Sequence, residues 1–470
     1  MALPLKKRVL ISVSDKTGVI EFAKELDSLG YDILSTGGTA LVLRNAGLNV
    51  MNVSDITGFP ECLDGRVKTL HPMVHAGILA VRGNPEHMKQ LRELNVLPID
   101  VVAINLYPFK QTILQEKVTR EDAIENIDVG GPAMLRAAAK NWQDVSVIVN
   151  PDDYKTVISE LRALNTVTKT TKLKLAYKVF EHTSAYDALI AKYLRNETES
   201  DILPDTFTVT YDKVDDLPHG DNPHQRAAYY KEIGTGYEGT LQAAEQLHGD
   251  KLSYGNIVDT DLALDILKEF CEPCVVSVKD ANLFGIGITS GSVLAFNRVI
   301  DADIADKISA ELIIAPDYTD DALEILRQTD IRILKLPKIS LPNRSDMLDF
   351  KKIAGGLLVQ ESNTELMYES ELQFVTETKP TDEQMRDLII AAKAVKHIKS
   401  NAAVLVKNGV TVDNADGAVI AFDTADNCIE NAVKAGIKAI IQPFANENAI
   451  SLCNKYGVAM VLTGINHFKH

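Results

Sequence analysis

The chain has 470 residues, of which 46% are hydrophobic and 24% are charged, and its formal net charge at pH 7 is −16. This length allows about three domains of roughly 150 residues each. The acidic balance argues against a nucleic-acid coat, which needs a basic face. No apolar run reaches the roughly 18 residues of a membrane span, and nothing near the start has the pattern of a signal peptide. We therefore expect a cytoplasmic protein that binds neither membranes nor nucleic acid.

The cysteines are odd in number and scattered, which is typical of a chain from a reducing compartment. They are Cys62, Cys271, Cys274, Cys428 and Cys453. Cys271 and Cys274 form a C-x-x-C pattern, as in a redox pair or half of a zinc site. Because no second pair completes a zinc site, we interpret the two as small residues at the entry of a strand, and we expect no metal.

The first 150 residues alternate between apolar strands and helices. Strands are expected at 8–13, 31–35, 48–53, 99–107 and 144–149. A helix is expected from Lys16 to Leu29 and another from near Thr39. Continuous apolar strands separated by helices predict a doubly wound parallel sheet. Ligands of such sheets bind at the carboxyl ends of the strands.

The chain becomes helical from Pro151 to about Asn196, and a stretch rich in Pro and Asp then connects it to a second α/β region. Strands of that region are expected at 274–278, 292–297, 312–316, 331–336, 355–360, 401–406, 417–422, 438–443 and 458–464. We therefore predict two domains, residues 1–199 and residues 200–470.

Two predicted strands of the first domain end in turns that suit a phosphate group. The first is followed by Ser12, Ser14 and Lys16, and the second by Thr36 and the glycine pair Gly37 and Gly38. Hydroxyls, free backbone N–H groups and the positive end of a helix all favour an anion. Each turn alone is also explained by ordinary helix capping, and the occurrence of two in one sheet favours the anion site.

The loop that follows the third strand carries several cations. Arg66, Lys68 and Thr69 precede His71, Pro72 and His75 in a segment punctuated by glycine. The two histidines stand four apart like a metal-binding pair, but Pro72 lies between them and no H-E-x-x-H carboxylate accompanies them. Arg66 and Lys68 are either ordinary surface residues or part of the anion site.

Polar residues also follow the fourth strand. Tyr107 lies at its end, and Asp128 precedes the glycine pair that opens the helix ending near Lys140. Asp128 is either a turn residue or a functional carboxylate, and Lys140 is either a solvated helix end or a functional amine.

These segments together resemble one family, the inosine monophosphate (IMP) cyclohydrolase domain of the bifunctional purine biosynthesis enzyme. The motifs SVSDKTG, STGGTA, GRVKTLHP, NLYPF and IDVGG with LRAAAKN stand in the family's order and spacing, and HTSAYD (182–187) follows them. The resemblance implies a fold similar to that of methylglyoxal synthase. It also implies closure of a formylated aminoimidazole carboxamide ribotide (FAICAR) to IMP with loss of water, without a metal or cofactor.

The resemblance also assigns roles to residues. It places Lys68 and Tyr107 at the carboxamide of the substrate, and Asp128 with Lys140 at the formyl oxygen. It implies a phosphate and ribose cradle made of Ser12, Ser14, Lys16, Thr36, Gly37, Gly38, Arg66 and Thr69. Ring closure needs an oriented nucleophile, removal of its proton and stabilisation of an oxyanion, and these side chains can supply all three.

The second domain resembles the transformylase half of the same enzyme, which has a cytidine deaminase-like fold and transfers a formyl group from 10-formyltetrahydrofolate to the unformylated ribotide (AICAR). The segment from Lys279 through Asp280 to Asn282 matches its active-site strand, and Asn401 matches a further site residue. Asp280 replaces the family's histidine, and its reference pKa of about 3.9 makes it a poor proton relay near neutrality. Pro218 replaces a phosphate-binding arginine, and about two dozen family residues are missing before residue 292.

We therefore predict that formyl transfer is lost or weak and that 10-formyltetrahydrofolate is used only if this half is active. Two alternatives stay open: a fully bifunctional enzyme with a rebuilt second site, and a non-catalytic nucleotide-binding regulatory protein. The resemblance also implies a homodimer whose transformylase halves intertwine.

Overall fold

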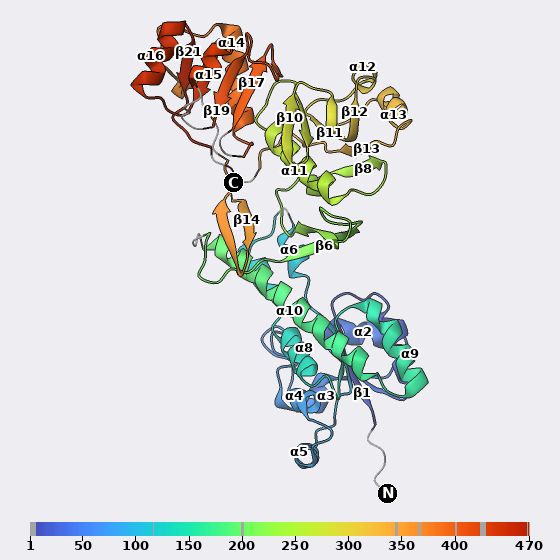
Figure 1. The fold of residues 1–470 in the computed structure, drawn as a ribbon. Helices are drawn as coiled ribbons and strands as arrows, with labels where there is room; N and C mark the ends of the chain where they lie inside the picture. The colour runs from blue at the N-terminus through green and yellow to red at the C-terminus, as the bar shows by residue number, and fades with distance from the viewer. Residues whose placement is uncertain are drawn as a thin grey trace. The chain divides into compact units, whose positions relative to one another are not determined.

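The computed structural model describes residues 6–115, 117–198, 202–343, 346–364, 367, 369–399, 402–423, 429–467 and 469. The chain forms two compact units, Met1–Thr210 and Tyr211–His470 (Figure 1). The predicted boundary after residue 199 falls inside the first unit, close to its end. Within the described residues, no helix is long and apolar enough to cross a membrane.

The first unit is built on a five-stranded parallel sheet with the order β3-β2-β1-β4-β5. Its strands are β1 (Arg8–Val13), β2 (Asp32–Ser35), β3 (Val50–Asn52), β4 (Val101–Asn105) and β5 (Ser146–Ile148). The predicted parallel sheet is therefore confirmed, although β3 and β5 are shorter than the apolar runs that contain them.

Helices separate these strands and cover the sheet. They are α1 (Val19–Ser28), α2 (Gly37–Asn45), α3 (Val53–Thr57), α4 (Pro72–Leu79), α5 (Pro85–Glu93), α6 (Phe109–Ile113), α7 (Arg120–Glu125), α8 (Gly130–Lys140), α9 (Tyr154–Leu164) and α10 (Lys169–Glu197). Alternate strand residues point to opposite faces, so Val9, Ile11 and Val13 pack in one core with residues of α1 and α9. Figure 1 shows the long α10 lying along α8.

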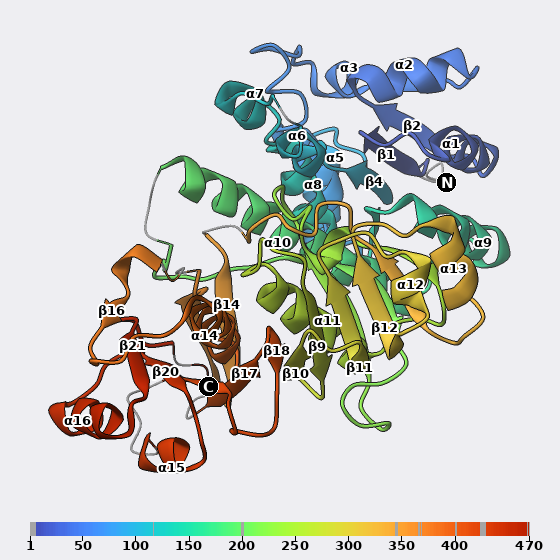
Figure 2. The same ribbon diagram turned by 90° about the horizontal axis from the view of Figure 1, so that it is seen from above.

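The second unit contains two six-stranded mixed sheets. The first has the order β10-β9-β11-β12-β13-β8 and the second the order β16-β21-β20-β19-β17-β18. In the first sheet the strands are β8 (Glu245–His248), β9 (Val275–Lys279), β10 (Asn282–Ile286), β11 (Ser290–Phe296), β12 (Ser309–Ala315) and β13 (Arg332–Lys335). Figure 2 shows β9, β11 and β12 side by side, as their pairing requires. The parallel pattern of the first domain was expected here too, but β9 pairs antiparallel with both β10 and β11. The two-residue turn at 280–281 joins β9 to β10, and such short turns connect antiparallel strands.

The second sheet of this unit consists of β16 (Gln373–Phe374), β17 (Ala403–Lys407), β18 (Val410–Thr411), β19 (Val419–Phe422), β20 (Ala439–Gln442) and β21 (Ala459–Leu462). The helices of the unit are α11 (Tyr254–Leu267), α12 (Ala302–Ala305), α13 (Asp320–Leu326), α14 (Asp382–Val395), α15 (Ile429–Lys434) and α16 (Glu447–Tyr456). One hydrophobic core includes residues of α11 and α14 together with residues of both sheets.

Two hairpins complete the second unit: β6 (Tyr211–Leu217) with β7 (Ala227–Glu232), and β14 (Leu348–Ile353) with β15 (Gly356–Glu361). The strand expected at 355–360 is therefore present, but it forms a two-stranded hairpin instead of joining a larger sheet. The β14–β15 hairpin exposes Phe350, Ile353, Leu357 and Leu358.

Candidate active site of the first unit

The turns after β1 and β2 are tied to each other by hydroxyl groups. Ser12 Oγ and Thr36 Oγ1 lie 2.9 Å apart, and Thr39 Oγ1 donates to the carbonyl of Val13 at 3.0 Å. Lys16 Nζ donates to Thr39 Oγ1 at 3.0 Å and also to the Val13 carbonyl. Burial lowers the pKa of Lys16, although Asp15 opposes this effect. The two predicted anion turns therefore form one polar edge at the carboxyl ends of neighbouring strands.

Asn105, the last residue of β4, extends this edge across the sheet. Its Oδ1 accepts the backbone N–H groups of Ser14 at 2.5 Å and Asp15 at 2.9 Å. This side chain fixes the turn that presents Ser14, and it was absent from the predicted site residues. The signal that could have found it is a single polar residue at the end of a buried strand.

The loop between α3 and α4 brings Lys68 and Thr69 to the same edge. A β-carbon placed on Gly37 would lie 3.7 Å from Lys68 Nζ, and one on Gly130 would lie 2.8 Å from Thr69 Oγ1. Lys68 Nζ also lies 3.1 Å from Glu61 Oε1. Lys68 is therefore next to the glycine turn after β2, and Thr69 is next to the start of α8.

Arg66 points elsewhere in this structure. It is exposed and pairs with Glu125 at the end of α7. Its predicted contact with a substrate phosphate would require this surface ion pair to open. Exposed pairs of this kind contribute little to stability, so the pair is a weak obstacle.

Asp128 is held at the start of α8 by backbone groups. Its Oδ1 accepts the N–H of Gly131 at 2.8 Å, and the N–H of Tyr107 also hydrogen-bonds to this carboxylate. Burial raises the pKa of Asp128 above its ordinary value, and these two hydrogen bonds only partly offset that rise. Tyr107 itself is exposed. The structure thus joins Tyr107 and Asp128 in one place and gives the carboxylate a tendency to take up a proton.

Lys140 lies apart from this group. It is the last residue of α8, whose first residue is Gly130. An α-helix rises 1.5 Å per residue, so the Cα of Lys140 lies about 15 Å beyond that of Gly130 along the helix axis. The predicted pairing of Lys140 with Asp128 is therefore not formed in this structure, and only Lys68, Tyr107 and Asp128 of the predicted catalytic residues lie at the strand-end edge.

Within the described part of the chain, no cluster of three or more His, Cys, Asp or Glu side chains has the arrangement of a metal site. His71 instead caps α4, because its Nδ1 accepts the N–H of Met73 at 3.2 Å. Cys271 and Cys274 are free thiols, and burial raises the pKa of Cys274 to about 12.

The active-site strand predicted in the second unit is a tight hairpin. Lys279 at the end of β9 pairs with Asn282 at the start of β10, and Asp280 and Ala281 form the turn with φ values of 52° and 56°. Asn282 Nδ2 donates to the carbonyl of Asp280 at 2.7 Å, and both Lys279 and Asp280 are exposed. The turn consists of two non-glycine residues, and the nearby glycines, Gly285 and Gly287, lie in β10 and directly after it.

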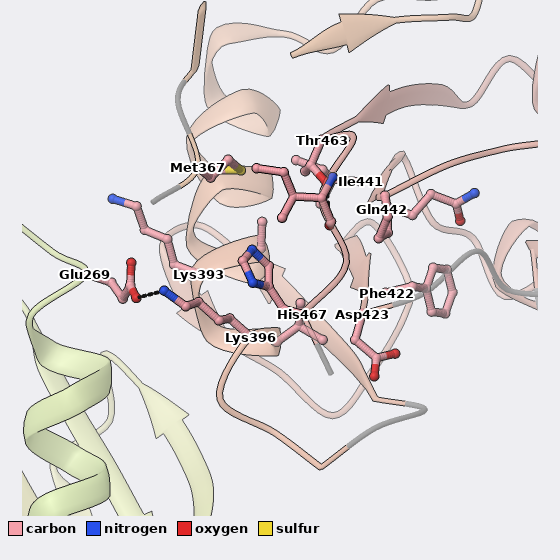
Figure 3. A pocket seen from close by; sticks show the side chains of 14 residues that line it. Glu269, Met367, Lys393, Lys396, Phe422, Asp423, Ile441, Gln442, Thr463 and His467 are labelled. Atoms are coloured by element: carbon pink, nitrogen blue, oxygen red, sulfur yellow. Dashed lines mark hydrogen bonds and ion pairs between the residues drawn. The ribbon is translucent and has the colours of Figure 1, made fainter. Parts of the chain in front are cut away.

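A small pocket lies elsewhere in this unit. Its lining includes Glu269, Lys393, Lys396, Asp423 and His467. Figure 3 shows Glu269 paired with Lys396, and His467 among the other side chains that line this pocket. Lys279, Asp280 and Asn282 are not among the residues that line it. Asn401 lies outside the described residues.

A buried ion cluster forms one side of this pocket. Glu269 Oε1 lies 2.8 Å from Lys396 Nζ and 3.2 Å from His397 Nε2, and the side chains of all three residues are almost fully buried. Burial alone would raise the pKa of Glu269, but the hydrogen bonds and positive charge of its two partners more than compensate and lower it. Asp423 Oδ1 in the same pocket accepts the N–H of Ala402 at 3.0 Å.

The sequence matches two family models. Residues 18–133 match the model described as "MGS-like domain", and residues 138–431 match the model described as "AICARFT/IMPCHase bienzyme". The bifunctional purine biosynthesis protein PurH of Acetivibrio thermocellus is 52% identical over 514 aligned positions, which cover 99% of this chain and 100% of the relative. PurH of Ruminiclostridium cellulolyticum is 52% identical over 513 positions with the same coverage. A solved structure described as "Crystal structure of ForH" is 37% identical, covers 40% of this chain and 98% of its own, and has a TM-score of 0.36.

An MGS-like sheet domain followed by a bienzyme region defines an enzyme of purine biosynthesis. More specifically, the chain belongs to the family of the bifunctional purine biosynthesis protein PurH. The alignments are longer than the 470 residues of the chain, so the relatives contain residues that have no counterpart here. The similarity nevertheless extends over the full length of the chain. It favours both activities of the family and does not support the predicted loss of formyl transfer.

Proposed function

We propose that the first unit is an IMP cyclohydrolase that closes FAICAR to IMP with loss of water. The observation that carries this proposal is the Asp128 carboxylate, partly buried between the N–H groups of Tyr107 and Gly131 at the edge that also holds the anion turns. A carboxyl group with a raised pKa takes up a proton more readily than an ordinary aspartate. The loss of the formyl oxygen as water requires such a proton donor.

The other residues of the edge have supporting roles in the proposal. The turns with Ser12, Ser14 and Lys16 and with Thr36, Gly37 and Gly38 hold the phosphate and ribose, since hydroxyls, a lysine and free N–H groups all converge there. Thr69 belongs to the same cradle, and Arg66 joins it once its pair with Glu125 opens. Lys68 and Tyr107 orient the carboxamide that attacks the formyl carbon. No metal or cofactor takes part in this reaction.

For the second unit, two hypotheses differ in one activity. The full-length similarity favours a working AICAR transformylase that uses 10-formyltetrahydrofolate. The tight turn at Asp280, and the position of Lys279 outside the lining of the pocket, support impaired formyl transfer instead. We retain the impaired activity as our proposal because the substitution of Asp280 for histidine removes a proton relay at this position.

One experiment separates these possibilities. The purified protein is given FAICAR alone, AICAR alone, and AICAR with 10-formyltetrahydrofolate, and IMP is measured. We expect rapid IMP formation from FAICAR and little from AICAR with the formyl donor. Robust turnover in the last mixture would reject the impaired transformylase. Binding of IMP without any turnover of FAICAR would instead indicate a nucleotide-binding regulatory protein.

We also propose that the protein is a homodimer formed through the second unit. The β14–β15 hairpin exposes large apolar side chains, and an isolated two-stranded hairpin is marginally stable in water. A second copy of the chain that covers this hairpin would supply the missing packing. Analytical ultracentrifugation should show a dimer, and a variant with Phe350→Glu and Leu358→Glu should shift it toward monomer.

A further inference from the structure

Tyr186 on α10 makes two hydrogen bonds to the loop that carries Asp128. Its hydroxyl accepts the backbone N–H of Asp128 at 2.8 Å and donates to the carbonyl of Asn126 at 3.2 Å. The side chain is 9% exposed. The hydroxyl therefore holds the backbone on both sides of residue 127 in one geometry, directly at the proposed catalytic carboxylate.

The ring of Tyr186 also connects to the loop that carries Tyr107. It packs edge-on against Phe109, with ring centroids 6.1 Å apart. Phe109 is fully buried at the start of α6, and its N–H donates to the carbonyl of Tyr107 at 2.8 Å. One side chain of α10 thus contacts the loop of Asp128 directly and reaches the loop of Tyr107 through Phe109.

The two loops meet at the Asp128 carboxylate, which accepts N–H groups from Tyr107 and Gly131. An angular error of a few degrees in the backbone at residue 128 would lengthen both hydrogen bonds. Catalytic groups need placement to within about 0.5 Å, and a buried hydroxyl fixed by a rigid helix supplies such placement. Burial also raises the pKa of Tyr186 to about 12, so the hydroxyl keeps the proton that it donates to Asn126.

We propose that Tyr186 is a positioning residue for IMP cyclohydrolase chemistry, which acts by holding Asp128 in the geometry needed for proton exchange. This inference rests on the proposed function of the first unit. It predicts a loss confined to the chemical step, because the phosphate and ribose cradle lies on other loops and does not touch Tyr186.

Tyr193 provides a matched control on the same helix. Its ring also packs edge-on against Phe109, with centroids 5.7 Å apart. Its hydroxyl lies near the charged groups of Arg120, Glu121 and Glu197 and away from Asp128. Tyr193→Phe therefore removes a comparable hydroxyl from the same aromatic cluster without removing a contact to the catalytic loop.

The test compares Tyr186→Phe with Tyr193→Phe in the full-length protein, at a temperature at which circular dichroism shows both variants to be folded. With FAICAR as substrate, we expect Tyr186→Phe to lower kcat at least tenfold with KM changed less than twofold, and Tyr193→Phe to change neither by more than twofold. Equal kcat values for the two variants would overturn the inference, as would a Tyr186→Phe effect that appears only in KM. If the wild-type protein binds IMP but does not turn over FAICAR, the proposed function fails instead. That result concerns the wild type alone, so it is distinguishable from the two variant outcomes that would overturn the role of Tyr186.

Discussion

Two buried carboxylates, one in each unit, have opposite acid–base properties. Asp128 accepts hydrogen bonds only from neutral backbone N–H groups, so burial dominates and its pKa rises. Glu269 contacts the ammonium of Lys396 and the imidazole of His397, so charge dominates and its pKa falls. The residue type and the degree of burial are similar, and the difference comes from the charge of the partners. A buried carboxylate with neutral partners takes up a proton more readily, whereas a buried carboxylate with cationic partners is stabilised in its charged form.

The largest expected effect is on stability, at Glu269. Glu269→Gln removes the charge that compensates the buried Lys396, and breaking such a pair costs about 3 kcal/mol of unfolding free energy. Calorimetry at pH 7 should show this loss. Glu430→Gln removes an exposed pair with Lys434 and should change little. Equal melting temperatures for the two variants would contradict the role given to Glu269.

The pH dependence of the Glu269 effect has a defined sign. The folded-state pKa lies below the ordinary value of 4.5, so the stability that this group contributes is complete above pH 4.5 and is lost as the pH falls through the folded pKa. The difference between wild type and Glu269→Gln should therefore shrink below pH 4.5. A difference that grows on acidification would show that the pairing is unfavourable.

Asp128→Asn should reduce FAICAR turnover at least 10²-fold, which corresponds to about 2.7 kcal/mol of transition-state stabilisation. Asparagine keeps the shape of the side chain but cannot exchange the proton. Steady-state assays of IMP formation measure the loss of turnover. Asp187→Asn, on the exposed side of α10, is the control. A turnover near that of wild type would remove Asp128 from the mechanism.

The effect of Asp128→Asn on stability should depend on pH in the opposite direction to the effect of Glu269→Gln. A raised folded-state pKa means that this group stabilises the fold fully below its ordinary value of 3.8 and less as the pH rises through the folded pKa. Asparagine does not ionise, so the melting temperature of Asp128→Asn relative to wild type should increase as the pH rises from 4 to 7. If the melting temperatures of the variant and the wild type change with pH in parallel, burial does not raise the pKa of Asp128.

The two lysines predicted at the reacting groups, Lys68 and Lys140, should differ in how strongly their removal lowers turnover. Lys68→Ala removes an amine next to Gly37 and should lower kcat/KM tenfold or more, whereas Lys140→Ala removes an amine at the far end of α8 and should have a smaller effect. Parallel assays with FAICAR compare the variants. A loss of kcat/KM in Lys140→Ala as large as that in Lys68→Ala would support the role that the resemblance assigns to Lys140. The end of α8 would then have to lie closer to the bound substrate than it does in this structure.

The smallest expected effect concerns the hairpin turn at Asp280. Ala281 has a φ of 56°, in the left-handed region that costs an L-residue about 1 kcal/mol or more. Ala281→Gly should raise the unfolding free energy by about 0.5 kcal/mol, since turns of this type favour Asp-Gly. The β17–β18 turn offers the reverse change, because Gly409 has a φ of 78° and Gly409→Ala should destabilise. A loss of stability in Ala281→Gly would show that Ala281 has a role beyond the turn.

The parallel sheet of the first unit could be predicted from its apolar strands, and the polar residues that follow those strands in sequence predicted where its candidate site would lie. Ser12 and Thr36 met as expected for this reason. The contribution of Tyr186 could not be predicted, because 58 residues separate it from Asp128 and only tertiary packing unites them. The position of Lys140 is a second example: the residue is close to Asp128 in sequence, but α8 carries its Cα about 15 Å beyond that of Gly130 along the helix axis. Its predicted catalytic role stays a prediction. In the second unit, the match of Lys279 and Asn282 to an active-site strand could be read from the sequence, but the two-residue turn at Asp280 and Ala281 could not, because no Asn-Gly or Asp-Gly pair marks it.

The homodimer that we propose would give the β14–β15 hairpin a consequence for folding. Its apolar side chains lie on strands that the rest of the unit leaves exposed. In that dimer, the step that buries them involves two molecules and depends on protein concentration. Before that step, the exposed apolar hairpin of each chain can associate with other unfolded or partly folded chains and lead to aggregation. The yield on refolding should thus pass through a maximum, limited by slow encounter in dilute solution and by aggregation in concentrated solution.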